Sequence, residues 1–518
     1  MESKSFQILI AMAAYIAVVI GIGVHYAKRA NESTHNYLIG GRSLGPWITA
    51  MGAEASDMSG WLLMGLPGVA YFFGLSDAIW TAIGLLIGTY LNWLFVAKRL
   101  RRYSMVASDA ITIPDFFSNR FQENKKIILT IAAVFILIFF TVYAASCFVT
   151  VGKLFNTLFQ VKYQYMMIAG ALFVILYTFI GGFLAESASD FMQGIIMFLA
   201  LTAVLVTGVV KAGGIAAVIE NARQIPGFMD FFGIATPVMA DGVQKIEAGK
   251  PMFGAAASYG FLTIISTLSW GLGYFGMPQV LTKFMAIRHP RELKLARRIA
   301  TVWCAISLTA AVAIGIIGRV LYPAAFQTQG TSESVFILLS TNFFFPLLAG
   351  LVMAGILAAT ISSSDSYLLI AASAFSKSIY QGLLKKKPTD RTLLLVTRLT
   401  LVVIAIVAMI IALDENSVIF KVVSFAWAGF GATFGPIMLF SLFWKRVTRS
   451  GAIAGMLTGG GMVFIWKLLI KPLGGVFGIY ELMPAFILSC LAIVVVSLLS
   501  QKPAKEIQEE FEHVRNLK

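Results

Sequence analysis

The chain has 518 residues, of which 58% are hydrophobic and only 13% are charged, far below the roughly 25% of a soluble domain. This composition indicates an all-α polytopic membrane protein and excludes an ordinary soluble fold. The net charge of +15 does not point to nucleic acid, because the basic residues fall in short loops between apolar runs, where the positive-inside rule explains them.

Apolar runs of about 20 residues are long enough to cross a bilayer as helices. The sequence contains about thirteen such runs, near 7–27, 45–72, 76–97, 128–157, 163–184, 189–210, 253–282, 299–321, 334–376, 394–413, 417–444, 451–470 and 479–500. The runs 45–72 and 334–376 are longer than one crossing requires. Their length predicts tilt, a kink or an attached loop helix.

The distribution of basic residues predicts the orientation. Clusters at 98–102, 288–298 and 385–387 fall on one side of the bilayer if the number of spans is odd. The positive-inside rule assigns that side to the cytoplasm. The N-terminus is then outside, and residues 501–518 form a charged, helical cytoplasmic tail.

The second run carries an unusual density of polar residues, with Glu54, Ser56, Asp57 and Ser59 before a Gly-Leu-Pro break at 65–67. A carboxylate at the bilayer centre costs about 2.5 to 3.5 kcal/mol on the insertion scale. The stretch therefore predicts a locally unwound segment enclosed by protein, whose free carbonyls could coordinate a cation. The alternative is that Glu54 and Asp57 lie at a helix end near the headgroups.

The next runs contain two further candidates. Tyr143 in the fourth run suits packing or the membrane interface, and Asp190 at the start of the sixth suits either a solvated helix end or a buried ion site. In the loop before the fourth run, Thr112 and Pro114 predict the opening of a short helix. The long loop at 211–251 is a plausible lid.

The seventh run repeats the anomaly of the second, because residues 269–278 contain three glycines and Pro278. A pair of Gly/Pro-interrupted segments at corresponding positions of two halves is typical of transporters built from inverted repeats. The sequence therefore predicts one transmembrane domain over 1–500. Repeat one covers about 45–210, repeat two covers about 253–444, and 7–27, 451–470 and 479–500 are additional helices.

The ninth run supplies a hydroxyl-rich stretch at 358–366. Ser362, Asp365 and Ser366 share one helix face by their spacing. Oxygen ligands of this kind suit a hard cation such as sodium. Close helix packing by small residues explains the alanines of the stretch but not the acid at 365.

Several separated motifs resemble one family. They are GGRSLGPW at 40–47, ASDMSGWLLMGLPG at 55–68, YTFIGGFLA at 177–185, WGLGYFGMP at 270–278 and AGILAATISSSDS at 354–366. Together they resemble the sodium:solute symporter family, most closely its sodium/proline branch. The resemblance implies a leucine-transporter-type fold of two five-helix inverted repeats, and import of a small solute with sodium.

The resemblance also implies site residues. The sodium ligands would be the carbonyls of Ala55, Met58 and Ala359 and the hydroxyls of Ser362 and Ser363, with Asp57 nearby. The substrate would lie near Tyr143, Trp270, Tyr274 and Pro278. A possible second cation or proton site would use Asp190, Asp365 and Ser366. Asp365 pairing with a basic residue, such as Arg42 or a lysine of an inner loop, is the structural alternative.

The predicted function is sodium-coupled import of L-proline by alternating access across a bacterial plasma membrane. Another small carboxylated solute, such as pantothenate, is the alternative within the family, and a channel is the alternative outside it. An enzyme is not expected, because no His, Cys or phosphate-loop constellation occurs at membrane depth. Sodium, the solute and the lipid bilayer are the expected partners, nucleic acid is not expected, and the sequence does not indicate whether a protein partner binds.

Overall fold

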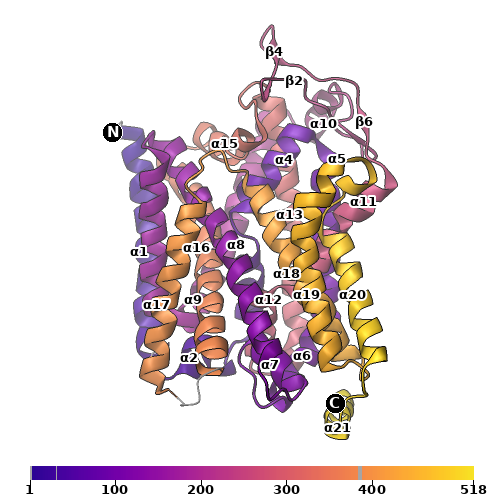
Figure 1. Ribbon diagram of the computed structural model, residues 1–518. Helices are drawn as coiled ribbons and strands as arrows, with labels where there is room; N and C mark the ends of the chain where they lie inside the picture. Colours follow the sequence, from indigo (N-terminus) through magenta and orange to yellow (C-terminus); the bar gives the residue numbers. More distant parts are fainter. Residues whose placement is uncertain (1–2, 31, 383–387, 518) are drawn as a thin grey trace.

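The computed structural model describes residues 3–30, 32–382 and 388–517. Within them, ten helices are long and apolar enough to cross a membrane. Three shorter apolar helices cover Trp61–Phe73, Tyr163–Phe179 and Phe261–Gly276. Helix α1 (Ser3–Ala30) begins at the upper end of Figure 1, and α21 (Lys505–Asn516) lies beyond the lower end. The predicted polytopic helical architecture is confirmed at this level, whereas the number thirteen stays a prediction.

The helices of the first half follow the predicted runs closely. They are α2 (Thr34–Ile39), α3 (Pro46–Asp57), α4 (Leu66–Phe73), α5 (Leu75–Leu91), α6 (Ala97–Val106), α7 (Ile113–Arg120), α8 (Ile127–Phe159), α9 (Tyr163–Lys211) and α10 (Ile215–Arg223). Thr112 caps α7 by accepting a hydrogen bond from the Asp115 amide, as its sequence predicts.

The second half continues with α11 (Phe261–Leu268), α12 (Pro278–Ala286), α13 (Leu293–Leu321), α14 (Gln329–Ser332), α15 (Val335–Phe343), α16 (Pro346–Ser373), α17 (Asp390–Ile411), α18 (Ile419–Phe443), α19 (Arg449–Ile465) and α20 (Leu482–Leu499). The long run 334–376 is thus a loop helix followed by a span. Short 3-10 or π segments are η1 (Gly40–Arg42), η3 (Asn92–Val96), η5 (Pro290–Glu292), η6 (Ala374–Gln381), η7 (Trp466–Ile470), η8 (Lys471–Leu473) and η9 (Gly475–Gly478). The predicted basic cluster at 385–387 lies outside the described residues.

The loop before α11 contains short strands that the sequence did not predict. Three small antiparallel pairs form there: β1 (Gly233–Ile234) with β6 (Ala257–Ser258), β2 (Met239–Ala240) with β3 (Val243–Gln244), and β4 (Ile246–Glu247) with β5 (Lys250–Pro251). They lie at the upper end in Figure 1. Residues 253–260, predicted as helix, belong to this loop, because the backbone of β6 pairs with β1 before α11 begins.

Two predicted spans, 163–184 and 189–210, are the two arms of α9. The arms meet at Gly182, whose φ of +56° breaks the helical path. A Cβ at this position would lie 2.7 Å from the Tyr37 ring, so both the backbone conformation and the close packing require glycine. Asp190 follows this break inside the second arm and is fully buried, which rejects the solvated helix end.

Both predicted interruptions are present. Helix α3 ends at Asp57. Helical structure resumes at Gly60, directly before the π-helical segment η2 (Trp61–Gly65), so the turn around Met58 is unwound. The second break is the 3-10 segment η4 (Ser269–Gly276) between α11 and α12. Trp270, Tyr274 and Pro278 therefore do not share one continuous α-helical face.

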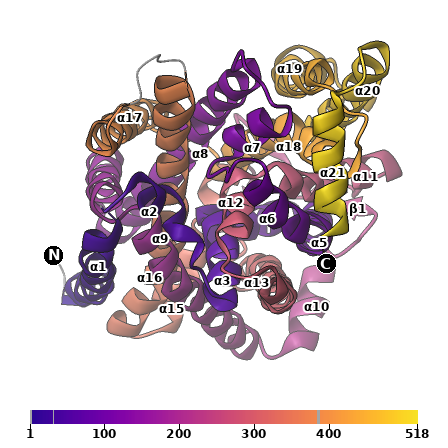
Figure 2. The ribbon, with the colours of Figure 1, turned by 90° about the horizontal axis from the view of Figure 1, so that it is seen from below.

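Burial separates a central group of helices from peripheral ones. The most apolar window of α16 is 83% buried and that of α18 is 78%, against 33% for α1, α17 and α20 and 28% for α19. Viewed from below, α1 and α17 lie on one flank, and α19 and α20 lie on the opposite one (Figure 2). The polar motifs lie on the central helices, where the bilayer does not reach them.

Candidate functional site

The unwound turn after α3 lies against the hydroxyl-rich stretch of α16. Ser362 Oγ donates to the Ala55 carbonyl at 2.7 Å and approaches the Ala359 carbonyl at 3.3 Å. Ser363 Oγ lies 3.4 Å from the same Ala55 oxygen. Four of the five oxygen atoms predicted as sodium ligands are therefore gathered in one buried place.

The fifth predicted ligand, Met58, is buried in the adjoining turn. Its amide donates to the Glu54 carbonyl at 2.8 Å and ends the helical pattern of α3. The carbonyls after such a helix end are free for other partners, because no following helical amide reaches them. The arrangement around Ala55, Met58 and Ser362 is an oxygen-rich cradle that fits a small hard cation.

Asp57 is fully buried beside this cradle. The Tyr274 hydroxyl donates to its Oδ2 at 2.7 Å, and Gln279 Nε2 donates to its Oδ1 at 3.4 Å. Among the described residues, no Lys, Arg or His lies within 4 Å of this carboxylate. A buried acid without a basic partner is costly unless something else supplies positive charge. Asp57 is therefore suited to a mobile cation.

Three of the four predicted substrate residues lie at this centre. The Tyr143 hydroxyl donates to the Asp57 carbonyl at 3.4 Å, and Tyr274 holds the Asp57 carboxylate. Trp270 precedes Tyr274 in η4, and its ring lies 6.2 Å from that of Trp61. Pro278, the fourth, begins α12 directly below the 3-10 segment.

Polar atoms without partners mark the same region. Among the described residues, the buried atoms Ser59 Oγ, Trp61 Nε1, Tyr367 Oη and Gln279 Oε1 have no hydrogen-bond partner. Buried polar groups are normally satisfied, so a group of them points to a ligand or water. The Tyr367 ring stacks on Tyr143 with centroids 4.3 Å apart, which connects this atom to the aromatic set.

The predicted second site is larger than the sequence indicates. Lys283 Nζ lies 2.9 Å from both Glu186 Oε1 and Asp190 Oδ2. The Ser366 hydroxyl donates to the same Glu186 oxygen, and the Ser366 amide donates to Asp365 Oδ1 at 2.7 Å. The predicted residues Asp190, Asp365 and Ser366 are therefore joined in one buried cluster through Glu186 and Lys283.

The proposed pairing of Asp365 with Arg42 is wrong. Arg42 Nη2 instead lies 2.9 Å from Asp109, and its guanidinium also donates to the carbonyls of Met285 and Ala110. These contacts occupy the guanidinium at the lower end of the bundle. One oxygen of Asp365, Oδ2, has no partner among the described residues.

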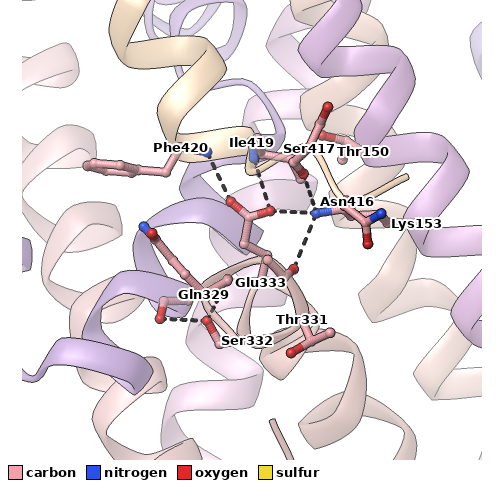
Figure 3. Close-up of polar contacts among 12 residues, drawn as sticks. Thr150, Lys153, Gln329, Thr331, Ser332, Glu333, Asn416, Ser417, Ile419 and Phe420 are labelled. Carbon is pink, nitrogen blue, oxygen red and sulfur yellow. Dashed lines mark hydrogen bonds and ion pairs between the residues drawn. The ribbon is translucent and has the colours of Figure 1, made fainter. Parts of the chain in front are cut away.

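A second buried ion pair lies in the upper half (Figure 3). Glu333 Oε2 lies 2.8 Å from Lys153 Nζ on α8. The same carboxylate accepts hydrogen bonds at 3.0 Å from the amides of Ile419 and Phe420 at the start of α18. A helix N-terminus favours a negative group, so Glu333 connects the α14–α15 loop to both α8 and α18.

Lys153 of this pair lines a large cavity at the upper end. The cavity has a volume of about 1190 Å³, and Lys153, Thr157, Tyr163, Phe326 and Lys421 contribute to its lining. Below the pair, Thr150 is fully buried and packs against Gly60 of the unwound turn. The ion pair thus separates the cavity from the candidate sodium site.

Sequence reasoning missed five residues of these arrangements. They are Gln279, Tyr367, Glu186, Lys283 and Glu333. Gln279 and Tyr367 directly follow the predicted Pro278 and Ser366, so their position beside a motif was a usable signal. Glu186 stood in the polar opening of the sixth run. Nothing local marked Lys283 or Glu333, because their partners come from distant segments.

Sequence comparison identifies close relatives. The family model described as "Sodium:solute symporter family" matches residues 37–459. The chain is 40% identical over 519 aligned residues to a protein named "Sodium/proline symporter" from Staphylococcus aureus strain JH9, covering 99% of this chain and 96% of the relative. The protein of the same name from strain NCTC 8325 matches equally.

Structural comparison supports the fold. A Na+-coupled sialic acid symporter in a substrate-bound outward-open state matches with a TM-score of 0.77 at 19% identity, covering 96% of this chain and 99% of that one. The transporter MhsT in complex with L-phenylalanine matches with a TM-score of 0.53 at 13% identity, covering 87% and 98%. These neighbours have the leucine-transporter-type fold.

Proposed function

The chain belongs to the sodium:solute symporter family, and from that premise we propose that it imports L-proline with sodium by alternating access. Sodium is the coupling ion of the family, and the chain is a multi-pass membrane protein. The observation that supports this function best is the juxtaposition of the Ala55–Ser362 oxygen cradle, the unpaired acid Asp57 and the aromatic residues Tyr143 and Tyr274.

The sodium site in this proposal consists of the Ala55, Met58 and Ala359 carbonyls and the Ser362 and Ser363 hydroxyls. Asp57 contributes negative charge without coordinating directly. Its carboxylate is held by Tyr274, so ion binding and the conformation of η4 are connected through one hydrogen bond of 2.7 Å. This connection is a physical route by which sodium could stabilise the solute site.

The solute site in this proposal lies among Tyr143, Trp270, Tyr274 and Pro278. A proline ring suits an apolar aromatic pocket, and its carboxylate suits free donors at an interrupted helix. The unpartnered Trp61 indole N–H and Ser59 hydroxyl at the unwound turn are such donors. They lie on the same broken segment as Asp57, so cation and solute would bind side by side.

The finer architecture is also part of the proposal. The ten long helices and the three shorter apolar ones are consistent with thirteen spans in two inverted repeats at about 45–210 and 253–444. The basic clusters at 98–102, within α6, and at 288–298, which includes η5 and the start of α13, lie towards the lower end in Figure 1. We place this end in the cytoplasm, with the C-terminal tail 501–518, and the N-terminus outside.

Of the second cation or proton site predicted at Asp190, Asp365 and Ser366, the proton version is proposed here. The cluster that Glu186 and Lys283 complete is buried and contains more acids than bases. Lys283 balances one negative charge, and the like charges that remain cannot all stay ionised without a proton. Reversal potentials measured at two pH values on wild type and on Asp365→Ser test a coupled proton, whose pH dependence the substitution would remove.

Transport in proteoliposomes tests the function directly. Labelled proline should accumulate above its external concentration when an inward sodium gradient is imposed, and this accumulation should disappear when potassium replaces sodium. Excess unlabelled pantothenate should not reduce the uptake of labelled proline. If pantothenate competed and unlabelled proline did not, pantothenate would be the solute. Equilibration without uphill accumulation would indicate a channel and contradict the symporter.

The two serines of the cradle provide a sharp test of the sodium site. The Ser362→Ala, Ser363→Ala double variant should raise the sodium concentration for half-maximal proline binding by about 10-fold or more, because each lost oxygen–cation contact is an ion–dipole interaction comparable to a hydrogen bond to a charged group, about 1.5 to 3 kcal/mol. Ser364→Ala is the matched control, since its hydroxyl donates only within α16, to Thr360 and Ile361. If the double variant and Ser364→Ala had the same sodium dependence, Ser362 and Ser363 would not be sodium ligands.

Trp270 tests the solute site. Trp270→Ala should weaken proline binding by about 10- to 100-fold, the effect of truncating a buried aromatic anchor, while sodium binding measured alone is retained. Isothermal titration calorimetry of the purified protein provides both values. Trp466→Ala is the control, because Trp466 lies on the peripheral flank and contacts Phe477. Normal proline affinity in Trp270→Ala would place the pocket elsewhere.

A further inference from the structure

A buried ammonium occupies the acidic cluster in the lower half of the bundle. Lys283 Nζ lies 2.9 Å from each of three oxygen atoms, Glu186 Oε1, Ser187 Oγ and Asp190 Oδ2. The side chain is 1% exposed, so these contacts replace water. An ammonium has three donors, and all three are used here.

The surroundings of this ammonium suit a cation in other respects. The nitrogen lies 4.7 Å from the centre of the Phe183 ring, an arrangement in which a ring attracts positive charge. An oxygen shell of two carboxylates and one hydroxyl is also what a hard alkali cation takes. The position of the nitrogen is therefore one that a free sodium ion could occupy.

Unpartnered oxygen atoms surround the same place. Among the described residues, Glu186 Oε2, Asp190 Oδ1 and Asp365 Oδ2 are buried and have no hydrogen-bond partner. Each of the three acids thus keeps one unused oxygen. If the ammonium were removed, both the shell around Lys283 and these spare atoms would be available to an incoming ion.

We propose that the Lys283 ammonium is the resident cation of this acidic site, so that no second sodium ion binds there. This inference rests on the proposed function and concerns its stoichiometry. A cation fixed to the chain cannot be released to either side of the membrane. The Ala55–Ser362 cradle is then the place for the sodium ion that travels with the solute.

The fixed cation also has a mechanical consequence. Lys283 is on α12, which directly follows η4, whereas its acidic partners are on α9. On the opposite side, α3 packs closely on the pair, since a Cβ at Gly52 would lie 3.4 Å from Nζ. The ion pairs therefore hold the lower part of the second broken segment against α9, close to the helix that ends at Asp57.

Counting bound sodium ions tests the proposal. The variant Lys283→Met keeps the length and apolar character of the side chain but removes its charge. Equilibrium binding of radioactive sodium to purified full-length protein should show a gain of one sodium ion per molecule in Lys283→Met over wild type. Lys283→Arg, which keeps a positive charge, should show no gain. The binding assay contains no solute, so the sodium count remains valid even if the transported solute is not proline.

A second substitution locates the added ion. Lys283→Met combined with Asp190→Asn should return the count to the wild-type value. An unchanged count in folded Lys283→Met, or a gain that Asp190→Asn does not remove, would overturn the proposal. If Lys283→Met does not fold, the wild-type count decides, because two sodium ions bound to wild type would contradict a resident ammonium and one would support it.

Discussion

Replacing Asp57 by asparagine is expected to raise the sodium concentration for half-maximal proline binding by about 10- to 100-fold, since a bond to a charged group contributes about 1.5 to 3 kcal/mol. Asparagine has nearly the same shape but no charge. Its amide nitrogen cannot accept the hydrogen bonds that the carboxylate takes from Tyr274 and Gln279. The cation would lose its nearest negative charge, and one of the two hydrogen bonds from Tyr274 and Gln279 would be lost, because asparagine keeps only one side-chain oxygen.

The measurement is a titration of proline binding with sodium on purified protein. Sodium raises the affinity for proline by a certain factor, and proline raises the affinity for sodium by the same factor, because coupling between ligands is reciprocal. In Asp57→Asn both factors should decrease by the same amount. Glu54→Gln is the matched control. Glu54 is a buried acid of the same helix, but its carboxylate accepts from Trp93 rather than from Tyr274. A sodium dependence in Asp57→Asn equal to that of wild type would contradict the role of this acid.

Replacing Glu333 by glutamine is expected to open the upper half of the protein. The change leaves the Lys153 ammonium buried without its charged partner, and breaking a buried pair in this way costs about 3 to 5 kcal/mol. That energy stabilises the closed arrangement of α8, α18 and the α14–α15 loop. Its loss would shift the equilibrium towards the open arrangement by about 100-fold or more.

Thiol labelling measures this shift. Thr150→Cys, in a background with Cys147, Cys304 and Cys490 replaced, places a reporter three residues before Lys153 on α8 and below the ion pair. An impermeant reagent should label this cysteine much faster in Glu333→Gln than in the parent, and proline uptake should slow because closure is impaired.

The control for Glu333 lies on the same rim. Glu415 is exposed at the cavity, so Glu415→Gln removes the same charge from the upper end without breaking a buried pair. Labelling in Glu415→Gln should match the parent. Equal labelling rates in Glu333→Gln and Glu415→Gln would show that the ion pair does not control access.

Features that depend on neighbouring residues could be predicted from the sequence. The apolar runs identify the membrane class, and the glycines and proline of 269–278 predict a break because they weaken helical hydrogen bonds locally. The polar stretch of α3 likewise predicted the unwound turn at Met58. The burial of Asp190 was left open, because its position in the sequence is equally compatible with a helix end.

Only the tertiary structure decided which charges meet. Lys283 is 97 residues from Glu186, and Lys153 is 180 residues from Glu333. Each pair depends on the packing of helices that no local pattern connects. A buried charge is stable only with its partner in place, so the fold as a whole determined that Arg42 contacts Asp109 and that Lys283 lies among the acids of α9.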